Sequence, residues 1–199
     1  MIHPTAIVSD RAEIGPGTEV GAYSIIEGEV SIGADTVVES HVRIGSRFGR
    51  VTIGEKNYIQ NGAALGGPPQ DSSYDFEPTE LSIGNRNRIG EYTTINLGSA
   101  KSGLTRIGNG TFIMGYVHVA HDCVVEDDVV LTNLVQLAGH STVEQGAILG
   151  GRAAVAQFAR VGRYAFIGTG VTVNKDILPY SIAAGDRWAT LRATNKIGL

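Results

Sequence analysis

Aliphatic residues recur at every sixth position along most of this 199-residue chain. The longest run keeps one phase through twelve repeats, from Ile107 to Val173, and shorter runs start at Ile2, Ile53 and Ile83. A period of six fits neither the roughly 3.6 residues per turn of an α-helix nor a hairpin meander with turns of irregular length. It fits very short strands joined by corners that each turn the chain by a fixed angle.

Hexapeptide repeats of this kind indicate a parallel β-helix, which is an all-β fold. Three hexapeptides make one triangular coil of about 18 residues, so residue i should stack on residue i+18 at about the 4.8 Å spacing of paired strands. The inward aliphatic side chains would then fill a triangular prism. Glycine accounts for 27 of the 199 residues, and this abundance would let the corners close.

Two segments leave this pattern and return to it in phase. Residues 66–82 contain three prolines and a cluster of acidic residues, and they therefore cannot continue a strand ladder. Residues 96–106 form a shorter segment rich in glycine and serine. Loops that leave a rigid scaffold at fixed points often carry function. A protected edge or a subunit contact is the alternative role, especially for the second segment.

Composition narrows the class of protein. The single cysteine, Cys123, cannot form an internal disulfide, which favours a reducing, cytoplasmic setting. No run of about 18 apolar residues is present, so we expect no membrane span.

The charge is unevenly distributed along the chain. Residues 150–199 carry seven Lys/Arg against two Asp/Glu, although the whole chain has a net charge of −4. This basic segment is either a solvated face or a docking surface for an acidic macromolecule or a phosphate-bearing ligand. Nucleic acid is a less favoured partner, because aromatic residues are not interleaved with these charges.

Two of the five histidines and the cysteine fall within nine consecutive residues of a chain that is poor in titratable groups. Coil geometry places His121 in one column with Gly139 and Gln157, and the adjacent column holds Asp122 and His140. We therefore expect His121 and His140 to be neighbours on successive coils. A histidine beside a carboxylate and an exposed amide N–H is a plausible general base with an oxyanion site.

Other interpretations of these residues stay open. A packed or loop-bonded histidine is the more common outcome on composition alone. Zinc binding by His118, His121 and His140 is less favoured, because the His-x-x-His spacing is unhelpful on a strand and no carboxylate is arranged to support the ligands. We therefore expect no metal. Cys123 is a poor candidate nucleophile, because the neighbouring Asp122 does not stabilise a thiolate.

Five short motifs together resemble the UDP-N-acetylglucosamine O-acyltransferases that begin lipid A synthesis. The motifs are Val117–Cys123, Leu137–His140, Gly84–Arg88, Gln70-Asp71 with Glu77–Thr79, and Gly103–Thr105. The resemblance covers essentially the whole chain. It implies a left-handed β-helix, which departs from the usual right-handed crossover, and a homotrimer with active sites between subunits.

The resemblance also implies roles for individual residues. His121 would remove the proton from the sugar 3-hydroxyl, Asp122 would help to orient His121, and the Gly139 N–H would bind the oxyanion. The donor would be an (R)-3-hydroxyacyl group on the phosphopantetheine of acyl carrier protein, with no further cofactor. The positions that match substrate-holding residues are Gln70, Asp71, His118, His140 and Gln157. Since acyl carrier proteins are acidic, the basic C-terminal segment suits such a partner.

The chain departs from the family pattern at several positions. Ser73 stands where the family usually has a lysine, Asn96-Leu97 replaces a His-Arg pair, and Ala156 replaces a histidine. Thr169 occupies a position that limits acyl length and would favour a shorter chain. We expect a β-helix domain over residues 1–180 and, over 181–199, the start of a truncated or missing helical domain. Transfer to a UDP-3-amino sugar and a catalytically weak binding scaffold are the alternative functions.

Overall fold

The computed structural model describes residues 1–186 and 188–196. This described part contains 25 strands and no helical residues. The strands are β1 (Ile7–Val8), β2 (Glu13–Ile14), β3 (Glu19–Val20), β4 (Ile25–Ile32), β5 (Val37–Val38), β6 (Arg43–Ile53), β7 (Tyr58–Ile59), β8 (Ala64–Gly67), β9 (Thr79–Ile83), β10 (Arg88–Ile89), β11 (Thr94–Asn96), β12 (Leu104–Ile107), β13 (Phe112–Ile113), β14 (His118–Val119), β15 (Val124–Val125), β16 (Val130–Leu131), β17 (Gln136–Leu137), β18 (Thr142–Val143), β19 (Ile148–Leu149), β20 (Ala154–Val155), β21 (Arg160–Val161), β22 (Phe166–Ile167), β23 (Thr172–Val173), β24 (Ser181–Ala184) and β25 (Thr190–Thr194). Within these residues, no helix is long enough and apolar enough to cross a bilayer.

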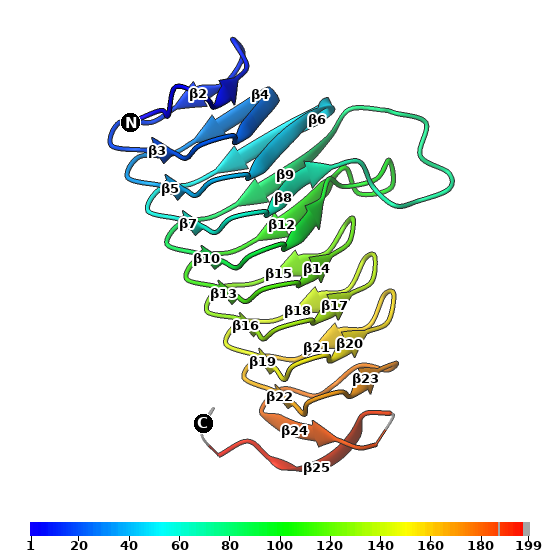
Figure 1. The fold of residues 1–199 in the computed structure, drawn as a ribbon. Coiled ribbons are helices and arrows are strands. Elements are labelled where there is room, and N and C mark those ends of the chain that lie inside the picture. Colours follow the sequence, from blue (N-terminus) through cyan, green and yellow to red (C-terminus); the bar gives the residue numbers. More distant parts are fainter. Residues whose placement is uncertain (187, 197–199) are drawn as a thin grey trace.

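Successive coils stack in parallel, as the six-residue period predicts. Val119 pairs with Leu137, Leu137 with Val155, and Val155 with Val173, in steps of 18 residues. Each regular coil consists of three short strands and three corners, and the coils pile up into the three-sided stack seen in Figure 1. The prediction of a triangular parallel β-helix is confirmed.

The strands define three faces of the prism. The first face carries β8, β11, β14, β17, β20 and β23, and the second carries β9, β12, β15, β18 and β21. These two faces are joined through the long strand β6, which pairs with both β8 and β9. The third face is a separate sheet that runs from β3 through β13, β16, β19 and β22 to β24 and β25.

Aliphatic side chains fill the interior of the prism. Val119, Val125 and Leu131, which follow one another at intervals of six residues, are fully buried. Burying one such side chain contributes about 1.5–3 kcal/mol to folding. Because every coil repeats this contribution, the stack is a continuous hydrophobic core that keeps its outer residues in fixed positions.

Glycine closes some corners, as expected, but has a second part elsewhere in the coils. The left-handed corner positions hold Gly146, with φ of 66°, and also larger residues such as Tyr116 and Asp122, each with φ of 61°. Many glycines instead stand where the backbones of adjacent coils approach each other. A Cβ on Gly33 would lie 2.6 Å from the carbonyl carbon of Gly54. Crowding between coils, rather than backbone dihedral freedom, therefore selects glycine there.

The two expected loops are shorter than the sequence indicated. Strands β8 and β9 extend into the segment 66–82, and β12 begins at Leu104, so the parts outside strands are residues 68–78, here called the first loop, and 97–103, the second loop. The first loop projects farthest from the stack (Figure 1). The ladder continues across both loops, since Ile53 pairs with Ile83 and Ile83 with Ile107.

The C-terminal residues cap the base of the prism. β24 pairs in parallel with β22 and antiparallel with β25, which forms a hairpin at the end of the third face (Figure 1). Residue 187 and residues 197–199 lie outside the described part of the chain. The expectation that residues 181–199 begin a helical domain stays a prediction.

Candidate active site

The corner after β14 brings His121 and Asp122 together. In a straight strand adjacent side chains point to opposite faces, but Asp122 has a φ of 61° and turns the chain. Its carboxylate consequently reaches the imidazole, with His121 Nδ1 2.7 Å from Asp122 Oδ2. The two side chains are 7% and 0% exposed. This arrangement is that of a general base whose ring is oriented by a carboxylate.

The second loop holds the Asp122 carboxylate. Ser99 donates its backbone N–H to Oδ1 at 2.8 Å and its hydroxyl to Oδ2 at 2.6 Å, and the Ser102 hydroxyl also donates to Oδ1. Burial alone would raise the pKa of Asp122, but hydrogen bonds from His121, Ser102 and Ser99 outweigh it and hold this pKa below its usual range. The carboxylate is therefore ionised and fixed in position.

The next coil supplies Gly139 and His140. A Cβ on Gly139 would lie 2.6 Å from His121 Cε1 and 2.7 Å from Nε2, so the contact requires glycine. No backbone carbonyl in the described part of the chain accepts the Gly139 N–H, which leaves this donor for a ligand. His140 meets His121 edge to face with ring centroids 5.2 Å apart, and it stacks on Phe158 at 4.8 Å. The expected contact between the two histidines is confirmed.

A groove of about 640 Å³ opens on the first face in front of His121. Its polar lining consists of Gln70, Asp71, Ser72, Lys101, His118, His121, Gln136, Gln157 and Thr172. Its apolar lining comes from Ala120, Leu137, Ala138, Ala154, Val155 and Ala156. The groove therefore offers hydrogen-bonding groups and a hydrocarbon surface to the same ligand.

Two polar side chains at the groove are held in place by neighbours. Asp71 accepts hydrogen bonds from the Ser73 N–H at 2.9 Å and from the Ser73 hydroxyl at 2.8 Å, and these bonds lower the pKa of Asp71. His118 Nδ1 lies 2.7 Å from Thr94 Oγ1. Burial lowers the pKa of His118, and the nearby His121 lowers it further. The neutral His118 ring can therefore bind a ligand by hydrogen bonding.

Comparisons with known proteins agree with this geometry. The family model described as bacterial transferase hexapeptide (six repeats) matches residues 11–46 and 104–139. The acyl-[acyl-carrier-protein]–UDP-N-acetylglucosamine O-acyltransferase of Herminiimonas arsenicoxydans is 45% identical over 188 residues, which are 94% of this chain and 71% of that protein. The protein of the same name from Xylella fastidiosa is 41% identical and covers 100% of this chain and 75% of its own length.

Solved structures give the same result. The UDP-N-acetylglucosamine acyltransferase of Francisella novicida superposes with a TM-score of 0.96 at 38% identity, over 100% of this chain and 72% of that one. The O-acyltransferase of Moraxella catarrhalis superposes with a TM-score of 0.95 at 43% identity, over 99% of this chain and 76% of that one. This chain belongs to the UDP-N-acetylglucosamine O-acyltransferase family. The expected left-handed β-helix, an all-β fold, is confirmed with it.

Most of the residues that the family resemblance singled out converge on the groove. Those that line it are Gln70, Asp71, His118, His121, Gly139 and Gln157. Asp122 and His140 stand behind His121 rather than in the lining. Thr169 does not lie among the lining residues; it is exposed at the corner that precedes β23. Its role in acyl length stays a prediction.

The departures from the family pattern lie in the groove lining or in and beside the two loops. Asn96 donates its side-chain amide to the Pro68 carbonyl at 2.8 Å and thereby ties the end of β11, directly before the second loop, to the first loop. Leu97 is fully buried, and Ala156 lines the groove. Ser73 holds Asp71, as described above. In this acyltransferase the substituted side chains therefore have structural contacts of their own.

Sequence reasoning missed Ser99, Lys101 and Ser102. The six-residue period gives no information about residues outside the coils. For the second loop, a subunit contact was as plausible an explanation as a functional role. The available signal was the polar run Ser99–Ser102, which lies between two strands of the coil preceding His121. Hydroxyl groups beside a buried carboxylate are the usual means of satisfying its oxygens.

Three potential metal ligands lie close together in this acyltransferase. One ligand atom from each of His121, Asp122 and His140 falls within 4.8 Å of the others, whereas His118, which the disfavoured zinc alternative included, is not in this group. The Asp122 oxygens already accept hydrogen bonds from His121 and from the second loop. An ion there would have to displace these bonds.

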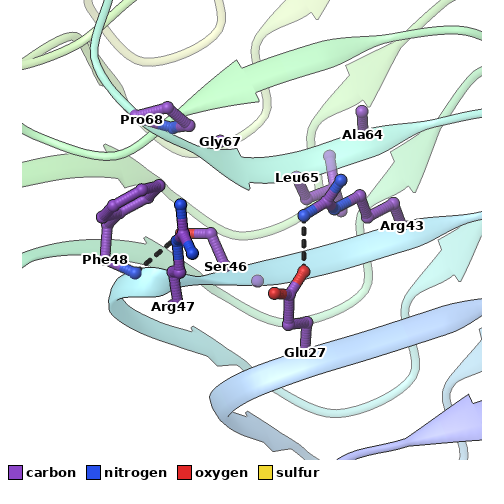
Figure 2. Close-up of a pocket in the computed structure, with 10 residues that line it drawn as sticks. Glu27, Arg43, Ser46, Arg47, Phe48, Ala64, Leu65, Gly67 and Pro68 are labelled. Carbon is purple, nitrogen blue, oxygen red and sulfur yellow. Dashed lines mark hydrogen bonds and ion pairs between the residues drawn. The ribbon is translucent and has the colours of Figure 1, made fainter.

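A second hollow, of about 400 Å³, lies between β6 and the root of the first loop (Figure 2). Arg43 reaches across it to the carboxylate of Glu27, and Arg47 lies over the Phe48 ring at 4.9 Å. The charge of Arg43 is therefore already paired. Among the described residues no histidine or cysteine lines this hollow, whereas the groove on the first face is lined by His121.

Proposed function

We propose that this protein moves an (R)-3-hydroxyacyl group from acyl carrier protein to the 3-hydroxyl of UDP-N-acetylglucosamine, the first step of lipid A biosynthesis. The observation that carries the proposal is the buried His121–Asp122 pair, packed against the Gly139 backbone in an amphipathic groove. Family relatives that carry this acyl transfer in their names support the same reaction.

The arrangement accounts for each proton and bond of the transfer. His121 takes the proton of the sugar hydroxyl, and the oxygen attacks the carbonyl carbon of the thioester. The resulting oxyanion is stabilised by the Gly139 N–H. The C–S bond then breaks, and the imidazolium of His121 returns its proton to the leaving thiolate. The products are an O-acylated sugar nucleotide and a free carrier thiol.

Asp122 makes His121 an effective base. Its ionised carboxylate accepts a hydrogen bond from the Nδ1–H group of His121, so the free Nε2 lone pair faces the groove next to Gly139. The same charge stabilises the imidazolium that forms when the hydroxyl is deprotonated. This alignment precedes substrate binding, because the second loop fixes the carboxylate in advance.

The substrate's parts match the groove's two kinds of lining. We assign Gln70, Asp71, His118 and Gln157 to the sugar and its neighbouring hydroxyls, and Lys101 to the diphosphate. Among the described lining residues Lys101 is the one lysine or arginine. The apolar stretch from Leu137 to Val155 suits the hydrocarbon of the donor. His140 supports His121 from behind and contacts substrate only at its edge.

The donor partner is acyl carrier protein, which presents the acyl group on its phosphopantetheine. The excess of basic residues in 150–199 supports docking of this acidic protein. Since the phosphopantetheine belongs to the carrier, the transferase needs no cofactor of its own. We place the reaction in the cytoplasm, where a buried free Cys123 is stable.

A homotrimer is supported by an apolar stripe on the third face. Phe112, Val130, Ile148 and Phe166 stack in one outward column. Phe112, Ile148 and Phe166 are 37%, 36% and 38% exposed in the single chain. A continuous apolar stripe of this length indicates a protein contact. We infer that a second copy covers this stripe and that the groove lies between subunits, as the family resemblance implies.

The decisive experiment is an acyl-transfer assay with UDP-N-acetylglucosamine and 3-hydroxyacyl carrier proteins of several chain lengths. We expect ester formation that falls by about 10³-fold or more in His121→Ala. A parallel reaction with a UDP-3-amino sugar tests amide formation. Equal background turnover by wild type and His121→Ala, with both acceptors, would rule out an acyltransferase and leave a binding scaffold.

A further inference from the structure

The Asp122 carboxylate is satisfied in an unusual way for a buried charge. Its ion-pair partners among the described residues are two histidines, His121 and His140, and no arginine or lysine. The remaining donors are the N–H and hydroxyl of Ser99 and the hydroxyl of Ser102. Uncharged hydrogen-bond donors from one short loop therefore supply most of the stabilisation of this charge.

These donors compete with His121 for the same oxygens. The Ser99 hydroxyl at 2.6 Å and His121 Nδ1 at 2.7 Å both bind Oδ2. Each hydrogen bond draws negative charge toward its donor and reduces the pull on the other proton. The number of serine hydroxyls at the carboxylate consequently affects how firmly His121 holds a proton, as well as where the carboxylate lies.

We propose that Ser99 and Ser102 are positioning residues that tune the His121 base through Asp122. The inference rests on the proposed function, because it assumes that His121 transfers the proton. The two hydroxyls reduce the strength with which the carboxylate attracts the Nδ1 proton of His121. His121 can then both accept a proton from the sugar and release it to the leaving thiolate. The second loop is thus part of the catalytic machinery without touching substrate through these serines.

Other titratable groups also face His121. His118 approaches from β14, His140 from the next coil, Asp71 from the first loop, and Lys101 lines the groove from the second loop. Lys101 and Ser99 are linked, because the Lys101 N–H donates to Ser99 Oγ at 3.4 Å. A test of the serines must therefore keep Lys101 unchanged and vary one hydroxyl at a time.

The pH dependence of kcat/KM tests the proposal in Ser99→Ala, Ser102→Ala and the double variant. We expect the acidic limb of the kcat/KM profile to move to higher pH. A carboxylate that accepts fewer hydrogen bonds from serine holds the imidazolium proton of His121 more strongly. The activity loss at pH 6 should exceed the loss at pH 8 by about three- to tenfold. Asp122→Asn should move the limb the opposite way, and Ser99→Thr, which keeps a hydroxyl, should restore the wild-type profile.

Ser141→Ala is the matched control. Ser141 is fully buried on the same corner as His140, but its hydroxyl contacts Cys123 Sγ at 3.3 Å rather than Asp122. This variant should lose stability without moving the acidic limb. Serine variants that lose activity equally at pH 6 and pH 8 would overturn the proposal, because a structural role alone predicts that result.

A measurement without turnover separates this inference from the proposed function. In protein with ¹⁵N-labelled histidine, the ring signal of His121, assigned with His121→Gln, can be titrated without substrate. We expect its titration curve in Ser102→Ala to move to higher pH even if the protein fails to transfer acyl groups. An unchanged curve would contradict the tuning role while leaving acyl transfer by His121 intact.

Discussion

The ring of His121 lies so close to the Cα of Gly139 that an added Cβ would come within 2.6 Å of Cε1 and 2.7 Å of Nε2. The ring cannot easily move away, because Nδ1 is bound to the Asp122 carboxylate on its other side. The base and the expected oxyanion donor are therefore held in mutual van der Waals contact. A single methyl group would disturb both.

Gly139→Ala should abolish most activity for this reason. We expect kcat to fall by about 10²-fold or more, because the methyl group displaces His121 and shields the adjacent N–H. Overpacking should also lower the free energy of unfolding by about 1–3 kcal/mol. Steady-state kinetics and urea denaturation measure the two effects. The control is Gly67→Ala, whose Cβ would meet Asn96 Nδ2 at an ordinary 3.5 Å.

Asp122→Asn should lower kcat by about 10²- to 10⁴-fold, because an amide can present the wrong group to His121 Nδ1. It should also change the pH dependence of stability. The folded-state pKa of Asp122 is depressed, so its stabilising contribution is present above its unfolded-state value and is lost as pH falls through the folded-state value.

The free energy of unfolding should accordingly differ most between wild type and Asp122→Asn at neutral pH. The difference should shrink below about pH 4, the ordinary range of an aspartate. Urea unfolding at pH 7 and at pH 3.5 measures it. A deficit of equal size at both pH values would show that the ionised carboxylate does not stabilise the fold.

Lys101→Ala should weaken binding of the sugar nucleotide and leave the chemical step largely intact. We expect KM for UDP-N-acetylglucosamine to rise by about three- to tenfold at low salt, with a smaller effect at high salt because the charge is exposed. Lys56→Ala is the control, since Lys56 lies outside the groove and its ammonium is 4.0 Å from Glu55. A KM that is unchanged at low salt would remove Lys101 from the diphosphate site.

Ile148→Arg should break up the trimer. The substitution places a charge in the apolar stripe of the third face, where a second subunit would leave it without water. Sedimentation velocity should show the wild type as trimers and the variant mostly as monomers. Leu104→Arg is the control, because Leu104 has the same 36% exposure but lies on the second face. Equal sedimentation of Ile148→Arg and wild type would exclude this face as the contact.

The six-residue period and the sequence positions of His121, Gly139 and His140 were enough to predict that these residues lie together. Stacking at intervals of 18 residues is a property of the repeat, so side chains far apart in sequence can be assigned to neighbouring coils by counting. The same counting placed Gln157 at the groove. The family resemblance, rather than the repeat, chose His121 over His118 as the base.

Counting could not place side chains that depend on the path of a loop or the dihedral angles of a corner. The hydrogen bond from His121 to Asp122 requires the left-handed backbone at Asp122, and the repeat does not state which residue turns the chain. The Ser99 and Ser102 contacts depend on how residues 97–103 fold back over the next coil. Those contacts are set by local packing and hydrogen bonding, which have no period.

The amino-acid sequence by itself determined the prism, because each hexapeptide buries one aliphatic side chain and the energy of that burial repeats along the chain. Only the tertiary structure decided how the His121 ring is held. Asp122 becomes a buried anion supported by the second loop, and Asn96, directly before that loop, is bonded to Pro68 in the first loop. Repeated burial specifies a scaffold from local pattern alone, whereas a buried charge depends on the few non-local donors that the folded chain brings to it.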